Sequence, residues 1–88
     1  MPLGDLGAFA EWAHREDPSY RLAMAIRGWI EGLARSPWQA PSLPIPEMSL
    51  AGEYQTRIAT VLGIEIIYQE QFADGRVDLL HVGTAPVT

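Results

Sequence analysis

The sequence predicts an α+β domain in which two N-terminal helices pack on a three-stranded antiparallel sheet. Apolar residues recur at three- and four-residue steps up to Arg35, and apolar and polar residues alternate from Glu53 to Val82. A proline-rich segment separates the two patterns. Because the helices and strands are segregated along the chain, an antiparallel sheet with helices on one face is expected.

The length and composition predict one domain with a single core. The chain has 88 residues, which is near the lower end of what folds alone. We expect a helical part at residues 5–35, a proline-rich connector at 36–52, a β-meander at 53–83 and a frayed tail at 83–88. With 48% hydrophobic and only 19% charged residues, some apolar surface is expected to be covered by a partner.

Capping residues locate the two helices. The first helix is expected at residues 6–15, with Asp5 as its N-cap. For the second helix, Asp17 is the expected N-cap and Pro18 fits the first turn, where its missing N–H costs nothing. The second helix should end at about Arg35, before Ser36 and Pro37. Its apolar face is formed by Leu22, Ile26, Trp29, Ile30 and Leu33.

The connector is expected to lack regular structure, because its prolines remove backbone donors. Apolar side chains lie between the prolines, which is not typical of a flexible linker. They are expected either to pack on the sheet and helices or to face a partner. These candidate partner-binding residues are Trp38, Leu43, Ile45 and Met48. Trp38 is the best candidate for an interface anchor, since tryptophan is enriched at binding hot spots.

Alternation with a period of two predicts the strands. They are expected at residues 54–61, 64–72 and 77–82. Leu62-Gly63 interrupts the first two, and Ala73-Asp74-Gly75 has the residue types of a tight hairpin turn.

The charge and the absent residue types exclude several classes of function. The net charge is −5, and all six basic residues are arginines spread widely along the sequence, so nucleic-acid binding is disfavoured. The absence of cysteine excludes disulfides, thiolate metal sites and cysteine nucleophiles. No metal-ligand cluster or glycine-rich phosphate loop is present in the sequence, so neither a metal nor a cofactor is expected. With no membrane span and no signal-peptide pattern in the sequence, a cytoplasmic location is expected.

Short motifs in the C-terminal half resemble the sheet of the RelE/ParE toxin superfamily. The motifs are Tyr54-x-x-Arg57, Ile66-x-Tyr68, Asp74-Gly75-Arg76-Val77 and Leu80-His81-Val82-Gly83. The resemblance implies a bacterial toxin that pairs with an antitoxin. Members of the RelE branch cleave mRNA on the ribosome, and members of the ParE branch act on DNA gyrase.

The resemblance names four candidate catalytic residues. Arg57 matches a position where the family often has a phosphate-contacting arginine, and Tyr68 matches a recurrent strand tyrosine. Arg76 and His81 complete the set to be tested. Each also has a structural interpretation: a solvated or carboxylate-paired Arg57 on the open sheet face, a structural Tyr68, a hairpin-end charge at Arg76 and a hydrogen-bonded His81.

The chain also departs from the family pattern. Glu65 stands where a second arginine is common, and Thr84-Ala85-Pro86 replaces a basic or aromatic ending. The family's first strand is missing unless residues 1–4 supply a short equivalent. A ribonuclease must neutralise charge at the scissile phosphate, and this chain has few groups for that task.

Three classes of function therefore fit the sequence, which leaves open whether the chain is a catalyst. The first is a RelE/ParE-like component of a toxin–antitoxin system, including one that has lost catalysis, with an antitoxin as its partner. The alternative is a non-catalytic interaction module that forms a homodimer or binds a partner chain through its sheet edge and proline-rich segment. A third option is an enzyme that uses His81 with a strand carboxylate.

Overall fold

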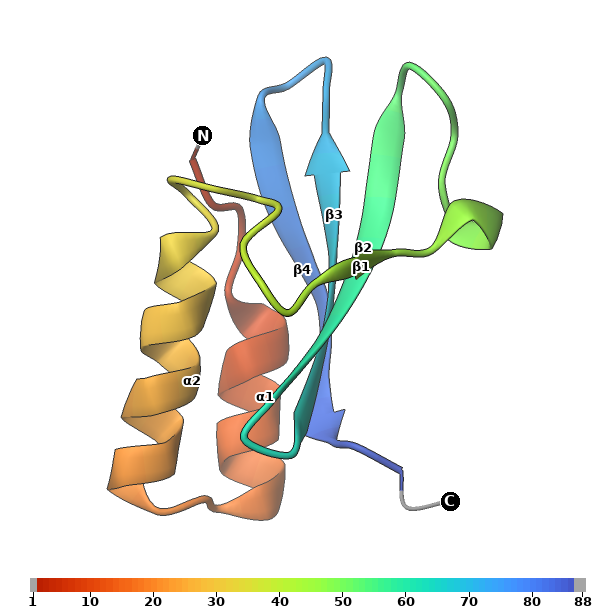
Figure 1. Ribbon diagram of the computed structural model, residues 1–88. Helices are drawn as coiled ribbons and strands as arrows, with labels where there is room; N and C mark the ends of the chain where they lie inside the picture. Colours follow the sequence, from red (N-terminus) through yellow and green to blue (C-terminus); the bar gives the residue numbers. More distant parts are fainter. Residues whose placement is uncertain (1, 87–88) are drawn as a thin grey trace.

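Two helices cover one face of a four-stranded antiparallel sheet in the computed structural model, which describes residues 2–86 (Figure 1). The strands lie in the order β1-β2-β3-β4. The elements are α1 (Gly7–Glu16), α2 (Tyr20–Gly32), β1 (Leu43–Pro44), the 3-10 helix η1 (Pro46–Met48), β2 (Tyr54–Val61), β3 (Ile64–Gln71) and β4 (Arg76–Thr84). The α+β class is confirmed, whereas the expected count of three strands is wrong.

The fourth strand comes from the connector, which we expected to lack regular structure. Leu43 pairs with Ile58 and Pro44 with Arg57, so β1 adds to the edge of β2. Pro44 is tolerated there because proline, which cannot donate to the ladder, is found in edge strands. The three-residue helix η1 begins two residues after Pro44, at Pro46.

The helix ends differ in detail from the sequence-based expectation. The expected N-cap of the first helix is wrong: α1 begins one residue later, so Leu6 is its N-cap and makes no side-chain cap hydrogen bond, while the Asp5 carboxylate accepts from Gly7 N at 2.6 Å one residue before the cap. Ser19, and not Asp17, caps α2, because its Oγ accepts from Leu22 N at 3.2 Å. Asp17 instead ends α1 in the left-handed conformation, with φ 45°. Helix α2 ends at Gly32, three residues before the expected Arg35.

Tight turns fix the register of the sheet. Leu62 and Gly63 both have positive φ and join β2 to β3 in a two-residue hairpin. This turn places Arg57 opposite Tyr68. Between β3 and β4 the register shifts at Ile67 and Tyr68, so that Leu80 has no partner and forms a β-bulge.

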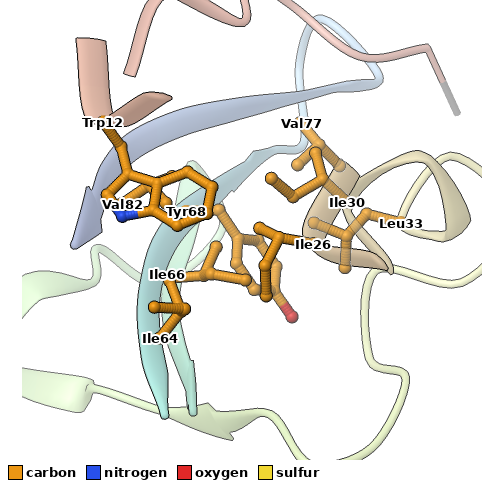
Figure 2. Packing of buried hydrophobic residues seen from close by; sticks show 9 residues of the cluster. All are labelled: Trp12, Ile26, Ile30, Leu33, Ile64, Ile66, Tyr68, Val77 and Val82. Atoms are coloured by element: carbon orange, nitrogen blue, oxygen red, sulfur yellow. The ribbon is translucent and has the colours of Figure 1, made fainter. Parts of the chain in front are cut away.

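The core lies between the helices and one face of the sheet (Figure 2). From β3, every second side chain points into it, and the side chains between point to the opposite face. Tyr68 and Trp12 are the largest fully buried side chains. The buried cluster consists of Trp12, Ile26, Ile30, Leu33, Ile64, Ile66, Tyr68, Val77 and Val82.

The connector strand β1 covers part of the β2 edge, and the N-terminal segment covers part of the β4 edge. At the β4 edge, Leu3 bridges Val77 in parallel, Gly4 N donates to Val77 O at 2.7 Å, and Val77 N donates to Pro2 O at 3.0 Å. The short N-terminal segment thus covers this part of the β4 edge. The C-terminal tail is less frayed than expected, since β4 continues through Thr84 and Ala85 N donates to Gly63 O. Val87 and Thr88, also part of that expected tail, lie outside the described residues.

Candidate functional site

The connector wraps around the β2 edge from one face of the sheet to the other. It begins on the helix-covered face, where Trp38 Nε1 donates to Glu70 Oε1 at 2.9 Å. It passes along β2 as β1 and then reaches the opposite face, where Thr56 Oγ1 donates to Met48 O. Figure 1 shows this path in yellow-green and green.

An open hollow of about 420 Å³ lies where the connector leaves the sheet edge. We call it the connector hollow. Most of its lining is apolar. The lining residues are Pro44, Pro46, Ser49, Ala51, Tyr54, Gln55 and Phe72.

Exposed apolar side chains lie on the hollow or next to its lining residues in the chain. Leu43, Met48, Leu50 and Phe72 are between 41% and 66% exposed. Leu43 precedes the lining residue Pro44, and Leu50 N donates to Tyr54 O at 3.0 Å. A small domain rarely leaves this much apolar area together unless something binds it.

The four residues predicted to bind a partner have different positions around this region. Leu43 and Met48 are exposed, and each is next in the chain to a residue that lines the hollow. Ile45 is half-buried, and its N–H donates to Thr56 O at 2.8 Å. Trp38 is 61% exposed but lies on the helix-covered face. Phe72 also lines the hollow but was not predicted to bind a partner. It is a large apolar residue directly before the hairpin turn, and the alternating pattern places it at the end of a strand.

Arg57 is held by the connector, and it does not lie on the open sheet face that one interpretation assumed. Its Nε donates to Ser42 Oγ at 3.1 Å, its Nη2 to Ser42 O at 3.2 Å and its Nη1 to Gln55 Oε1 at 3.0 Å. The guanidinium carbon also lies 5.9 Å from the centroid of the Trp38 ring. A phosphate bound at Arg57 would have to compete with all three acceptors.

Tyr68 lies across from Arg57 on β3 and is fully buried. Its hydroxyl donates to Pro37 O, which ties the sheet to the start of the connector. Burial raises the pKa of Tyr68, while Ser42 and Arg57 act in the opposite direction. A buried, protonated phenol with a backbone partner is suited to a structural role at neutral pH.

Arg76 lies at the β3–β4 hairpin and is paired with carboxylates. Its Nε is 2.7 Å from Asp78 Oδ1, and its Nη1 is 3.3 Å from Asp74 Oδ2. The hydrogen bonds that Arg76 donates to Asp78, together with the negative charge of Asp78, raise the pKa of Arg76. Its register partner Gln71 belongs to the opposite face of the sheet from Tyr68.

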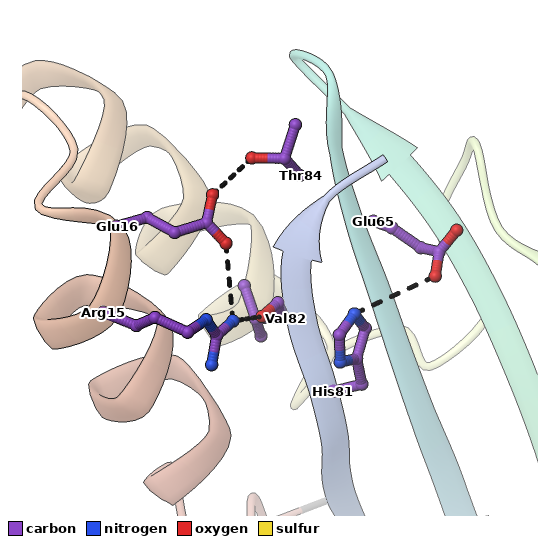
Figure 3. Close-up of polar contacts among 6 residues, drawn as sticks. All are labelled: Arg15, Glu16, Glu65, His81, Val82 and Thr84. Atoms are coloured by element: carbon purple, nitrogen blue, oxygen red, sulfur yellow. Dashed lines mark hydrogen bonds and ion pairs between the residues drawn. The ribbon is translucent and has the colours of Figure 1, made fainter. Parts of the chain in front are cut away.

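His81 also lies on that opposite face, as the register partner of Ile67. Its Nε2 is 3.9 Å from Glu65 Oε1, and Figure 3 shows this pair beside the end of β4. The neighbouring polar contacts join α1 to β4: Arg15 Nη2 donates to Val82 O at 3.1 Å, and Thr84 Oγ1 donates to Glu16. The Thr84 hydrogen bond lowers the pKa of Glu16.

The structure therefore brings together only two of the four candidate catalytic residues. Arg57 and Tyr68 are neighbours on the helix-covered face, whereas Arg76 and His81 are on the other face. Glu65 and Glu70 are also on opposite faces, as their parity in the sequence predicts. Because groups that act on one substrate must surround the same site, these four residues do not form one reaction centre.

Two acidic residues are next in the chain to residues that line the connector hollow. Glu47 is an exposed residue of η1, between the lining residue Pro46 and Met48. Glu53 is exposed, and its carbonyl oxygen accepts a hydrogen bond from Phe72 N at 3.0 Å. Neither carboxylate forms an ion pair within residues 2–86.

Two further searches bear on the kind of site. In the part of the chain that the structure describes, no three histidine or acidic side chains are grouped so that they could hold a metal ion. Neither α1 nor α2 has the length and apolar character needed to cross a membrane. Comparisons of the chain with protein-family models, with curated proteins and with solved structures find no match.

Proposed function

We propose that this chain is a non-catalytic interaction domain that binds a partner protein at the connector hollow. The observation that carries the proposal is an open, mostly apolar hollow lined by the exposed Phe72, with Leu43, Met48 and Leu50 exposed next to lining residues or close to them in the chain. Such a patch on a small domain is typical of a protein-binding surface.

The connector is held firmly enough to present a preformed surface. Ser49 Oγ donates to Ile45 O at 2.7 Å and accepts from Thr56 N at 2.9 Å, so one hydroxyl fixes both η1 and β2. At the other end, Trp29 Nε1 donates to Ala40 O at 3.1 Å, and Gln39 Nε2 donates to Trp29 O. A preformed surface binds with a smaller loss of conformational entropy than a flexible segment does.

Binding through a surface patch is better supported than the addition of a partner strand at a free sheet edge. β1 covers the middle of β2, and residues 2–4 cover Val77 on β4. An added strand could not run the full length of either edge without displacing one of these segments. The partner is therefore expected to contact side chains of the hollow.

The test is a selection of peptides from a displayed random library, followed by affinity measurements on variants. Phe72→Ser and Met48→Ser should weaken the selected peptides by at least about tenfold, as expected for contact residues near a hot spot. Tyr20→Ser is the matched control, because Tyr20 is 80% exposed and belongs to α2. If the peptides bind the Phe72 and Met48 variants as tightly as the unchanged chain, the proposal is wrong.

A second candidate is a RelE/ParE-like component of a toxin–antitoxin pair. Two observations favour it: Arg57 and Tyr68 are register partners on adjacent strands, and Leu3 of the N-terminal segment forms a parallel bridge with Val77 of β4. In this reading the hollow and the connector are the surface that an antitoxin covers.

Expression of the chain alone in a bacterial host separates the two candidates. A toxin that acts through Arg57 should arrest growth, and Arg57→Ala should relieve the arrest. Tyr20→Ser controls for the effect of any substitution on growth. Normal growth with the unchanged chain contradicts the toxin candidate and leaves the interaction domain.

A further inference from the structure

We infer that the connector hollow binds an extended, proline-rich segment of a partner protein in the polyproline II conformation. This partner chemistry rests on the proposed function of the hollow. Three observations carry it: rings line the hollow, the strand edge beside it is already paired, and two of its polar side chains have free hydrogen-bond donors.

Rings form most of the wall of the connector hollow. Of its seven lining residues, four carry a ring: Pro44, Pro46, Tyr54 and Phe72. Proline-rich segments are recognised in grooves lined by such rings, because a polyproline II helix is preformed and presents its own rings to them. A volume of about 420 Å³ takes one or two side chains, which is too small for the row of anchors that an amphipathic helix inserts.

The β2 edge at the hollow is already paired. Tyr54 N donates to Leu50 O and Leu50 N donates to Tyr54 O, both at 3.0 Å. Thr56 N donates to Ser49 Oγ, and Thr56 O accepts from Ile45 N. A bound β-strand would find no ladder partners here, and its N–H groups would lose water without a replacement. A polyproline II segment needs no ladder, and its prolines have no N–H to satisfy.

Two free donors belong to residues that line the hollow. Gln55 Oε1 accepts from Arg57 Nη1 at 3.0 Å, which leaves the amide nitrogen Nε2 as a donor. Neither this nitrogen nor the Tyr54 hydroxyl has a partner within residues 2–86, and neither atom is buried. Ser49 Oγ, by contrast, already donates one hydrogen bond and accepts another. The hollow therefore suits an apolar segment that brings carbonyl oxygens and no donors.

The charge next to Gln55 favours the same occupant. The three hydrogen bonds of Arg57 go to neutral oxygens of Ser42 and Gln55, and Arg57 forms no ion pair within the described residues. Glu70, the register partner of Gln55, accepts from Trp38 instead. The guanidinium polarises the Gln55 amide through their hydrogen bond, which strengthens Nε2 as a donor to a carbonyl oxygen.

The experiment uses NMR spectra of the full chain and two short synthetic peptides of equal length. One peptide is oligoproline, and in the other leucine and serine alternate. Oligoproline should shift the side-chain amide signals of Gln55 and the backbone signals of Tyr54 and Phe72, and it should bind more tightly than the leucine–serine peptide. Because oligoproline has no charged side chains, added salt should change its affinity little.

Two variants test the free donors and keep the surrounding structure. Gln55→Glu retains an oxygen for Arg57 Nη1 and replaces only the donor, so it should weaken oligoproline by about tenfold. Tyr54→Phe removes the hydroxyl and keeps the ring, and it should weaken oligoproline by about two- to fivefold. The control is Arg21→Gln, which changes the net charge as Gln55→Glu does, at an exposed position on α2, and should leave the affinity unchanged.

The outcomes separate the proline preference from the proposed function. If oligoproline binds Gln55→Glu as tightly as the unchanged chain, the inferred hydrogen bond is absent and the inference is wrong. If the leucine–serine peptide shifts the signals of the hollow and oligoproline does not, the proline preference is wrong and the hollow remains a binding site. If the peptides selected from the library also leave these signals unchanged, the proposed function is contradicted as well.

Discussion

Tyr68 shows how one side chain can look functional in the sequence and be structural in the fold. It lies opposite Arg57, as a catalytic pair would, but its ring packs edge-to-face against Trp29 at 6.1 Å and its hydroxyl binds Pro37 O. It therefore joins β3, α2 and the connector at a single point. Substitution of Tyr68 should therefore lower the stability of the fold.

We expect Tyr68→Phe to lower the free energy of unfolding by about 0.5–1.5 kcal/mol near neutral pH, because Pro37 O loses its donor. The difference in the free energy of unfolding between the two chains should narrow in alkali. The pKa of Tyr68 is raised in the folded state, so the unfolded chain loses this proton first, at about pH 10. Above that pH, the free energy of unfolding of the unchanged chain should fall by up to about 1.4 kcal/mol per pH unit, whereas the phenylalanine variant lacks this loss.

Urea denaturation from pH 7 to pH 11 measures both effects. Tyr20→Phe is the control, since that side chain is mostly exposed. Equal alkaline losses in the unchanged chain and in Tyr68→Phe would mean that Tyr68 does not keep its proton on folding.

At the scale of elements, the connector depends on one hydroxyl. Ser49→Ala removes a donor to Ile45 O and an acceptor for Thr56 N, and it leaves both backbone groups without that partner. We expect a loss of about 1–3 kcal/mol and faster hydrogen exchange at the Thr56 amide. Ser36→Ala is the matched control, because Ser36 is exposed. Unchanged exchange at Thr56 would show that the connector is held by its other contacts.

The long elements could be predicted from the sequence because their periodicity is local. Both helices and the three long strands follow from apolar spacing, and the strand ends agree to within a few residues. β1 could not be found in this way, because a two-residue strand has no period and exists only through its pairing with Ile58, which is remote in sequence. The position of the α2 cap was ambiguous for another reason: Asp17 and Ser19 are both good capping residues.

The site was predicted less well than the fold. The sequence left open whether the apolar side chains of the connector pack on the domain or face a partner, and the structure leaves Trp38, Leu43 and Met48 exposed. The half-buried position of Arg57 depends on the register, which the two-residue turn at Leu62 and Gly63 determines, and on which face the helices cover. The second condition is a property of tertiary packing and has no local signal.

For the whole molecule, the net charge and the covered sheet edges act together against self-association. A variant that begins at Asp5 would leave Val77 N and O without their partners and would open the β4 edge. Because each copy still has a large negative charge, we expect this variant to stay monomeric at low salt and to associate at high salt, where repulsion is screened.

Sedimentation velocity at low and high salt, with the full chain run in parallel, tests this expectation. The full chain should sediment alike in both buffers. If the shortened variant is monomeric at high salt, the segment at residues 2–4 does not protect the edge.

Gly32, the last residue of α2, packs against Gln39 near the start of the connector whose later part lines the hollow. A Cβ built there would lie 2.7 Å from Gln39 Oε1, so any side chain would push Gln39 away from Trp29 O. Gln39 precedes the stretch of connector that carries Ser42 and Pro44. A single replacement inside the helical layer could therefore retune what the domain recognises while every exposed contact residue stays the same, and a comparison of surfaces alone would overlook the cause.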